Sequence, residues 1–329
     1  FGSLDACECR HCASVYSPAA YLVDILHFLM NCRSSSPGRS ALDVLFARRP
    51  DLGEVDLTCD NTHTTLPYLD LVVEILENAV APGGAFPFQT AGEAADLLAS
   101  PAHVQSAAYG PQDNRLGGAV YPWSLPFDLW TEVARSYLQH MGVPRVELIQ
   151  GFRAASDANA AADAAAEFLG LTAADRSALL LTTLTARRRF WGLANAAALN
   201  AFVQARNVGA LLHRARMTYD ELLAVLAVPF VDLGGRLRVE FAGADCNLDT
   251  ATIINLDAPA LDRLHRFMRL QRKLPWRIDE LGALLGTLNV TALDDQALLR
   301  IAQVRRLQQA LGVPLRTLLG WWALRMDTY

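Results

Sequence analysis

The sequence predicts an all-α fold: an irregular stack of helical hairpins with one short β-hairpin near residues 229–241. Apolar residues recur with the period of an α-helix along most of the 329 positions, and glycine, serine and proline residues separate these stretches. Hydrophobic residues make up 52% of the chain and charged residues 19%. This composition is sufficient for a packed core and excludes a disordered chain.

The first two helices are expected near the N-terminus. Ser17 and Pro18 are typical of a helix start, and Leu22, Ile25, Leu26 and Leu29 then follow on one face. A second apolar stretch covers residues 71–80 and ends at Pro82-Gly83-Gly84. Both stretches contain acidic residues and neither reaches the ~18 apolar residues of a membrane span, so none is predicted.

A third helix is expected over residues 127–141. Its apolar residues fall on one face, namely Phe127, Trp130, Val133, Ala134, Tyr137, Leu138 and Met141. Gly142 is expected to end this helix and Pro144 to begin the next. The segment 141–148 (MGVPRVEL) resembles 311–318 (LGVPLRTL), with looser copies at 169–172, 217–220 and 274–277. Each copy predicts a helical hairpin that buries its apolar face only by stacking on its neighbours.

Residues 230–241 alternate between apolar and polar around Gly234-Gly235, which predicts the β-hairpin. Long loops rich in glycine and proline are expected at 81–88 and 110–126, as binding surfaces or covers between elements. The alanine-rich stretch 154–166 is interpreted as a joint. We therefore expect two subdomains, 1–153 with a Cys/His-rich start and 154–329.

The net charge of the chain argues against a nucleic-acid partner, because it is negative, with a formal value of −5. A basic helix face is expected opposite Leu264, Phe267 and Met268, and we interpret it as solvated; it comprises Arg263, Arg266, Arg269, Arg272 and Lys273. His265 and His213 lie near apolar stripes and are interpreted as packing or hydrogen-bonded residues.

The cysteines and histidines of the N-terminal region form the most pointed candidate site: Cys7, Cys9, His11, Cys12, Cys59 and His63. Thiolates and imidazoles at such spacings chelate zinc when four of them converge. The second pair, Cys59 and His63, departs from the usual zinc pattern. Disulfides are the favoured interpretation, and buried thiols or a zinc or other transition-metal site remain open.

Catalytic motifs of the common enzyme classes are not found in the sequence. There is no G-x-S-x-G, H-E-x-x-H, Walker or dinucleotide-binding pattern. Asp294-Asp295 is interpreted as a helix N-terminus, where acidic residues are favourable. We therefore expect a protein without catalytic residues.

Several blocks of the chain resemble one known family. They include CRHCASVYSPAAYLVDIL at 9–26, LPYLDLV at 66–72, TYDELL at 218–223, CNLDTATI at 246–253 and LDRLHRFMRL at 261–270, with shorter blocks at 48–53, 57–62 and 126–130. In this order they resemble the N-terminal helical region of the A component of tripartite (Tc) insecticidal toxin complexes and of the related virulence-plasmid A proteins.

The resemblance implies a non-enzymatic shell or scaffold module of a bacterial toxin subunit, acting by protein–protein contact in a translocation assembly. Its implied partners are other regions or copies of that subunit and a host receptor, and its implied location is secreted or at the cell surface. Two alternatives remain open. One is a free-standing, cytoplasmic enzyme or metal- or cofactor-binding protein on the same fold. Its site would lie near the Cys/His cluster or in a cavity walled by Tyr16, Tyr21, Trp123 and Trp130. The other is a receptor- or glycan-binding module that uses the loop 110–126.

Overall fold

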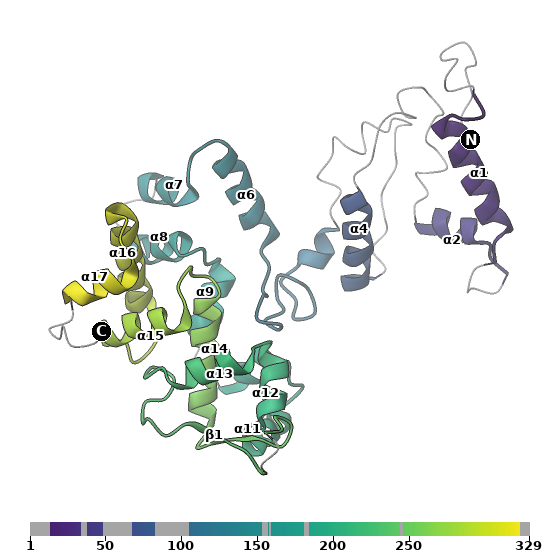
Figure 1. The fold of residues 1–329 in the computed structure, drawn as a ribbon. Coiled ribbons are helices and arrows are strands. Elements are labelled where there is room, and N and C mark those ends of the chain that lie inside the picture. Colours follow the sequence, from purple (N-terminus) through teal and green to yellow (C-terminus); the bar gives the residue numbers. More distant parts are fainter. Residues whose placement is uncertain are drawn as a thin grey trace. The chain divides into compact units, whose positions relative to one another are not determined.

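The structure, a computed structural model of the whole chain, describes residues 14–33, 38–48, 68–82, 105–152, 157, 159–180, 184–243 and 246–322. It is mostly helical with one short antiparallel pair of strands, which confirms the predicted fold class (Figure 1). Two compact units divide the chain, an N-terminal unit Phe1–Ala108 and a C-terminal unit Tyr109–Tyr329. This division differs from the expected one, because the helices before and after residue 154 contact each other within the C-terminal unit.

The N-terminal unit contains α1 (Pro18–Asn31), α2 (Ala41–Arg48) and α4 (Tyr68–Val80). The expected start of α1 is confirmed, because the Ser17 hydroxyl accepts from the Ala20 N–H at 3.1 Å. α1 contacts α2. At α4, the buried Glu77 accepts from the Gln105 N–H at 3.0 Å, and the Gln105 amide donates to the Ala81 carbonyl at 2.7 Å. These bonds hold residue 105 against the end of α4.

The C-terminal unit contains most of the described helices. They are α6 (Leu129–His140), α7 (Arg145–Phe152), α8 (Ala160–Phe168), α9 (Ala173–Leu180), α10 (Leu184–Phe190), α11 (Ala196–Ala205), α12 (Val208–Ala215), α13 (Tyr219–Leu226), α14 (Ala258–Gln271), α15 (Ile278–Thr287), α16 (Asp295–Leu311) and α17 (Leu315–Trp322).

The expected helix ends in this unit are confirmed at several positions. Gly142 and Gly312 adopt left-handed φ angles of +72° and +64°, which favour glycine, and α7 and α17 begin shortly after them. Asp294 caps α16 by accepting from the Ala297 N–H at 2.7 Å, as the acidic pair predicted. The repeated segments 141–148 and 311–318 thus share one turn geometry.

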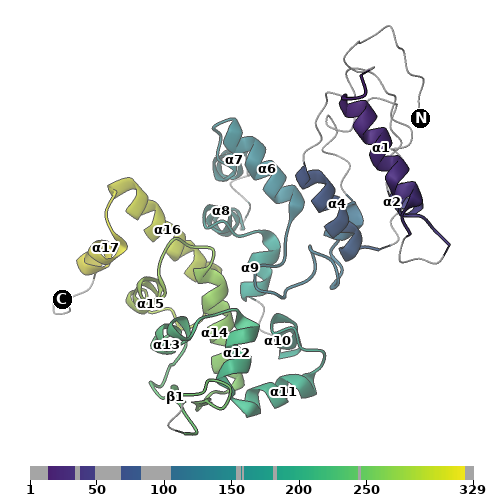
Figure 2. The same cartoon turned by 45° about the vertical axis from the view of Figure 1, so that its right-hand side comes forward.

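The core of the C-terminal unit is centred on α14. This helix contacts α9, α13 and α15, and it lies in the middle of the unit (Figure 2). Leu264, Phe267 and Leu270 are fully buried on it. Full burial of such a side chain stabilises the fold by roughly 1.5–3 kcal/mol. α14 is therefore the element on which the surrounding helices pack.

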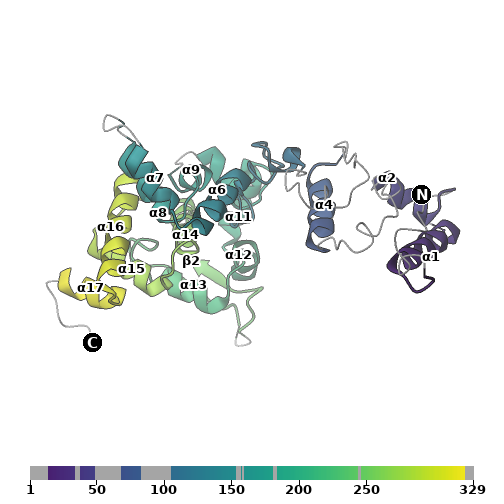
Figure 3. The same cartoon turned by 90° about the horizontal axis from the view of Figure 1, so that it is seen from above.

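The alanine-rich stretch is not a joint in the structure. Most of its described residues belong to α8, and Ala164, Ala165 and Ala166 are buried. α8 contacts α7 and α16, and α16 lies between α7 and α17 (Figures 1 and 3). Small alanine side chains allow neighbouring helices to approach closely. The weak hydrophobic periodicity of this stretch therefore reflects close helix packing.

The two strands are β1 (Arg238–Glu240) and β2 (Thr252–Ile254), with Val239 opposite Ile253. Only β1 falls in the segment expected to form a hairpin by itself. The residues before Gly234 have other partners: the Asp232 carboxylate accepts from the Gly234 N–H at 3.3 Å and the Leu237 N–H at 2.7 Å. Phe230 and Val231 are buried in the core. The Gly234-Gly235 turn therefore joins a buried segment to β1.

Candidate functional site

The N-terminal candidate residues lie outside the described residues: Cys7, Cys9, His11, Cys12, Cys59 and His63. Disulfide pairing, buried thiols and a metal site therefore stay predictions for them. Among the residues that are described, Cys32 is half-buried and Cys246 exposed, and both are free thiols. Within the same ranges, no three His, Cys, Asp or Glu side chains are grouped so that they could hold a metal ion.

The four aromatic residues expected to wall a cavity have different surroundings. Tyr16 and Tyr21 are exposed in the N-terminal unit. In the C-terminal unit Trp123 is buried in the core, where its Nε1–H donates to the Phe190 carbonyl at 2.6 Å, and Trp130 is exposed on α6. Trp123 and Trp130 thus have different surroundings, and the cavity stays a prediction.

A buried polar centre holds the loop 110–126 to α14. Arg269 is 1% exposed, and its guanidinium donates to the Val120 carbonyl at 2.7 Å and to the Leu125 carbonyl. Its Nε–H donates to Nε2 of His265 at 3.2 Å. Burial lowers the pKa of Arg269 to about 10, so the side chain stays a cation at neutral pH. The long loop is thus a cover over the core, held by Arg269 together with the Trp123 indole.

His265 completes this centre. Its ring stacks on Phe190 at 4.4 Å between centroids and meets Trp123 edge-on at 5.2 Å. Burial, together with the charges of neighbouring arginines, lowers the pKa of His265 well below its ordinary value. Because Nε2 accepts from Arg269, the neutral ring carries its proton on Nδ1. His265 is therefore a packed, hydrogen-bonded histidine, as expected from the sequence.

The basic face of α14 is not solvated along its length. Arg269 is buried as described, and Arg266 is also buried, with its Nε 3.0 Å from an Asp262 carboxylate oxygen. Arg187 approaches the same carboxylate at 3.5 Å. Burial raises the pKa of Asp262, although both arginines act to lower it. The expectation of a solvent-facing row is wrong here, because α14 is surrounded by other helices and its arginines pair inside the unit.

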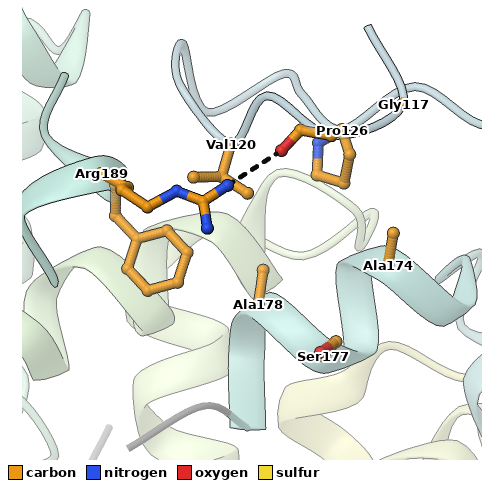
Figure 4. A pocket seen from close by; sticks show the side chains of 9 residues that line it. Gly117, Val120, Pro126, Ala174, Ser177, Ala178 and Arg189 are labelled. Carbon is orange, nitrogen blue, oxygen red and sulfur yellow. Dashed lines mark hydrogen bonds between the residues drawn. The ribbon is translucent and has the colours of Figure 1, made fainter. Parts of the chain in front are cut away.

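Two hollows are open on the C-terminal unit. The Arg189 hollow has a volume of about 180 Å³ and is lined by Gly117, Gly118, Val120, Pro126, Ala174, Ser177, Ala178, Arg189 and Phe190 (Figure 4). The alanine groove has a volume of about 370 Å³ and lies between α7, α8 and α16. Its floor is formed by alanines of α8 and α16, and Gln150, Gln303 and Arg306 are its polar residues. The Arg189 hollow is smaller than the ~300–1,000 Å³ of pockets that hold drug-sized ligands, and the alanine groove lies at the lower end of that range.

The apolar face of α6 is the largest departure from the sequence-based expectation. The helix itself is confirmed, but Trp130, Tyr137 and Met141 are 62%, 61% and 64% exposed. Together with Phe127 and Val133, which are also exposed, they form what we call the α6 stripe. Stacking within the described part of the C-terminal unit does not bury this stripe.

The opposite, polar side of α6 contacts the rest of the unit. Arg135 donates from Nε and Nη2 to the two carboxylate oxygens of Glu167 on α8, at 2.9 and 3.0 Å. Arg145 of α7 donates to the same carboxylate. The Arg135 fork also donates to the Leu171 carbonyl at 3.2 Å. Charge-assisted bonds therefore hold α6 with its aromatic side chains directed outward.

The outward orientation of the α6 stripe could not be derived from sequence periodicity, because periodicity identifies an apolar face without showing where that face points.

Among the described residues no helix is both long enough and apolar enough to cross a membrane. Comparison of the chain with protein-family models, with curated proteins and with solved structures finds no match.

Proposed function

We propose that this chain is a non-enzymatic helical scaffold module that acts by protein–protein contact through the α6 stripe. The observation that carries the proposal is the orientation of α6: its Arg135 side is fixed to Glu167, and its aromatic side is exposed. An amphipathic helix in a self-contained domain packs the other way round. Tryptophan, tyrosine and methionine are also enriched at protein interfaces, and the first two at binding hot spots.

Other exposed aromatic residues support a module that belongs to a larger assembly. Trp321 and Trp322 are exposed on α17, and Tyr21 and Phe28 are exposed on α1. Single exposed apolar residues are ordinary, whereas contiguous apolar patches on a soluble protein usually mark contact sites. The spacing of Trp130, Val133, Tyr137 and Met141 suits packing against another helix.

The finer proposal is that the assembly is a Tc-toxin-like translocation complex. It rests on the sequence blocks that resemble the A component, and on the helical architecture expected for that region. In this proposal, copies of the same module contact one another through the α6 stripe, and the protein is secreted or at the cell surface. A host receptor is a further proposed partner.

Sedimentation velocity over a range of protein concentrations tests the proposal. We expect the parent chain to self-associate, and the double variant Trp130→Gln, Tyr137→Gln to remain monomeric. Glutamine is a good helix former, so α6 itself is retained. The matched control is Leu223→Gln, which removes an exposed apolar side chain from α13 and is expected to associate like the parent. Equal association of the parent and the double variant would contradict the proposal.

The competing metal- or cofactor-binding function depends on residues outside the described ranges. Elemental analysis of the purified chain separates the two: about one equivalent of zinc or iron would favour the competing function. Thiol titration before and after reduction distinguishes disulfides from free thiols in the same sample.

A further inference from the structure

The walls of the Arg189 hollow combine an apolar body with a single cation. Three elements form it: the loop that carries Gly117, Val120 and Pro126, the helix α9 with Ala174, Ser177 and Ala178, and the end of α10 with Arg189 and Phe190 (Figure 4). Most of these side chains are aliphatic or aromatic. The guanidinium of Arg189 and the hydroxyl of Ser177 are the polar side-chain groups among the lining residues.

The volume of about 180 Å³ sets the size of a ligand. An apolar cavity of about 150 Å³ in another protein holds one benzene molecule. The Arg189 hollow therefore has room for one six-membered ring, or a branched aliphatic group of similar size, with one small substituent. It is too small for a nucleotide or an oligosaccharide.

The Arg189 guanidinium has N–H groups that could donate to a ligand. Its Nη2 donates to the Gly118 carbonyl at 3.3 Å and to the Asp113 carboxylate. Its Nε and Nη1 have no partner among the described residues. The Asp113 side chain is 73% exposed, and an ion pair at that exposure contributes about 0–1 kcal/mol. A carboxylate in the hollow can therefore bind the guanidinium fork without displacing a strong contact.

A second cation lies behind the loop wall. Arg269 donates to the carbonyls of Val120 and Leu125 and to His265, all of them neutral groups. The nearby Asp175 carboxylate is paired with Lys273 at 2.7 Å. Arg269 adds positive potential near the hollow, which the charge of the nearby Asp175 partly offsets.

We propose that the Arg189 hollow is a binding site for a small organic carboxylate with one compact apolar group, such as an aromatic or branched aliphatic acid. The carboxylate pairs with Arg189 near the mouth, and the apolar group contacts Phe190, Val120 and Pro126. This site is separate from the α6 stripe, and the proposal does not depend on the scaffold function.

Calorimetric titration of the full chain with benzoate, and with the neutral isostere benzamide, tests the proposal. We expect benzoate to bind at least tenfold more tightly than benzamide. Arg189→Gln should weaken benzoate binding at least tenfold. Arg188→Gln removes the same charge one residue away, from a side chain that is not among the lining residues, and should bind benzoate like the parent.

A second variant keeps the test independent of any structural effect at Arg189. Ala174→Leu places a larger side chain in the hollow and leaves Arg189 intact, and it should abolish benzoate binding. The proposal is overturned if the parent does not bind benzoate, if benzoate and benzamide bind equally, or if either Arg189→Gln or Ala174→Leu binds benzoate like the parent.

Discussion

His265 couples the stability of the C-terminal unit to pH. Burial and the neighbouring arginines lower its pKa in the folded chain, whereas in the unfolded chain the pKa is near the ordinary 6.5. Below that pH the unfolded state therefore binds the additional proton. Stability falls as the pH falls from 6.5 toward the folded-state pKa, by up to about 1.4 kcal/mol per pH unit.

The variant His265→Gln tests this coupling, because glutamine does not titrate and its carbonyl oxygen can accept from Arg269. Urea unfolding at pH 6.5 and pH 5.5 should show a smaller loss of unfolding free energy in this variant than in the parent, by up to about 1 kcal/mol. The matched comparison is His213→Gln, which removes an exposed histidine from the same unit. Equal pH dependence in the parent and His265→Gln would show that His265 is not responsible.

The sequence predicts the packing role of His265 but not the role of Arg269. A histidine beside Leu264 and Phe267 is expected near a core. The partners of Arg269 are the carbonyls of Val120 and Leu125, far along the chain. Because every residue has a backbone carbonyl, the sequence does not indicate which carbonyls Arg269 binds. From the sequence alone, Arg269 is therefore assigned to the basic face of the helix like the neighbouring arginines.

Glu167 joins three helices at the scale of the elements. Its side chain on α8 is 8% exposed and accepts from Arg135 on α6 and Arg145 on α7. Burial acts to lower the pKa of Arg135, but the hydrogen bonds and charge of Glu167 and Glu132 raise it above its ordinary value. The Glu167 carboxylate therefore links both helices of the α6–α7 hairpin to α8.

Glu167→Gln should lower the free energy of unfolding by about 1–3 kcal/mol, because it removes the buried carboxylate that two partly buried guanidinium groups share. Glu132→Gln is the matched control. Glu132 also pairs with Arg135, at 2.6 Å, but its side chain is 45% exposed, and the loss should stay below about 1 kcal/mol. Chemical denaturation measures both. Equal losses for the two variants would contradict the account of Glu167.

The helix α6 shows which features a periodic sequence pattern can predict and which it cannot. The apolar positions from Phe127 to Met141 and the stop at Gly142 predict the helix and its end, because local sequence determines both. The direction in which the stripe points depends on Arg135 meeting Glu167, which lies on another helix. Periodicity contains no information on that pairing, so the exposed stripe emerges only in the folded chain.

At the scale of the whole molecule, the C-terminal unit has a core of its own. One contiguous cluster of buried apolar residues extends from Trp123 to Leu319, entirely within Tyr109–Tyr329. The cluster joins Trp123 of the loop before residue 154 to residues of α8 and of α14 to α17 after it, so segments on both sides of residue 154 share it. A division of the chain at 153/154 would cut through packed helices.

A fragment consisting of residues 109–329 should therefore fold alone. We expect it to unfold cooperatively in urea, with circular dichroism showing the helical content of this unit. A fragment consisting of residues 154–329 lacks α6, α7 and the loop held by Arg269, and should unfold at lower urea concentration or without a cooperative transition. Equal stability of the two fragments would contradict the assignment of the core.

The central claim, that this chain works by contact through an outward-facing helix, is tested most directly by amide hydrogen exchange of α6 at low and high protein concentration. We expect the amides of Leu129–His140 to exchange more slowly when the chain associates, and the amides of α13 to be unchanged. Association that leaves exchange in α6 unaltered, and slows it elsewhere, would contradict the claim.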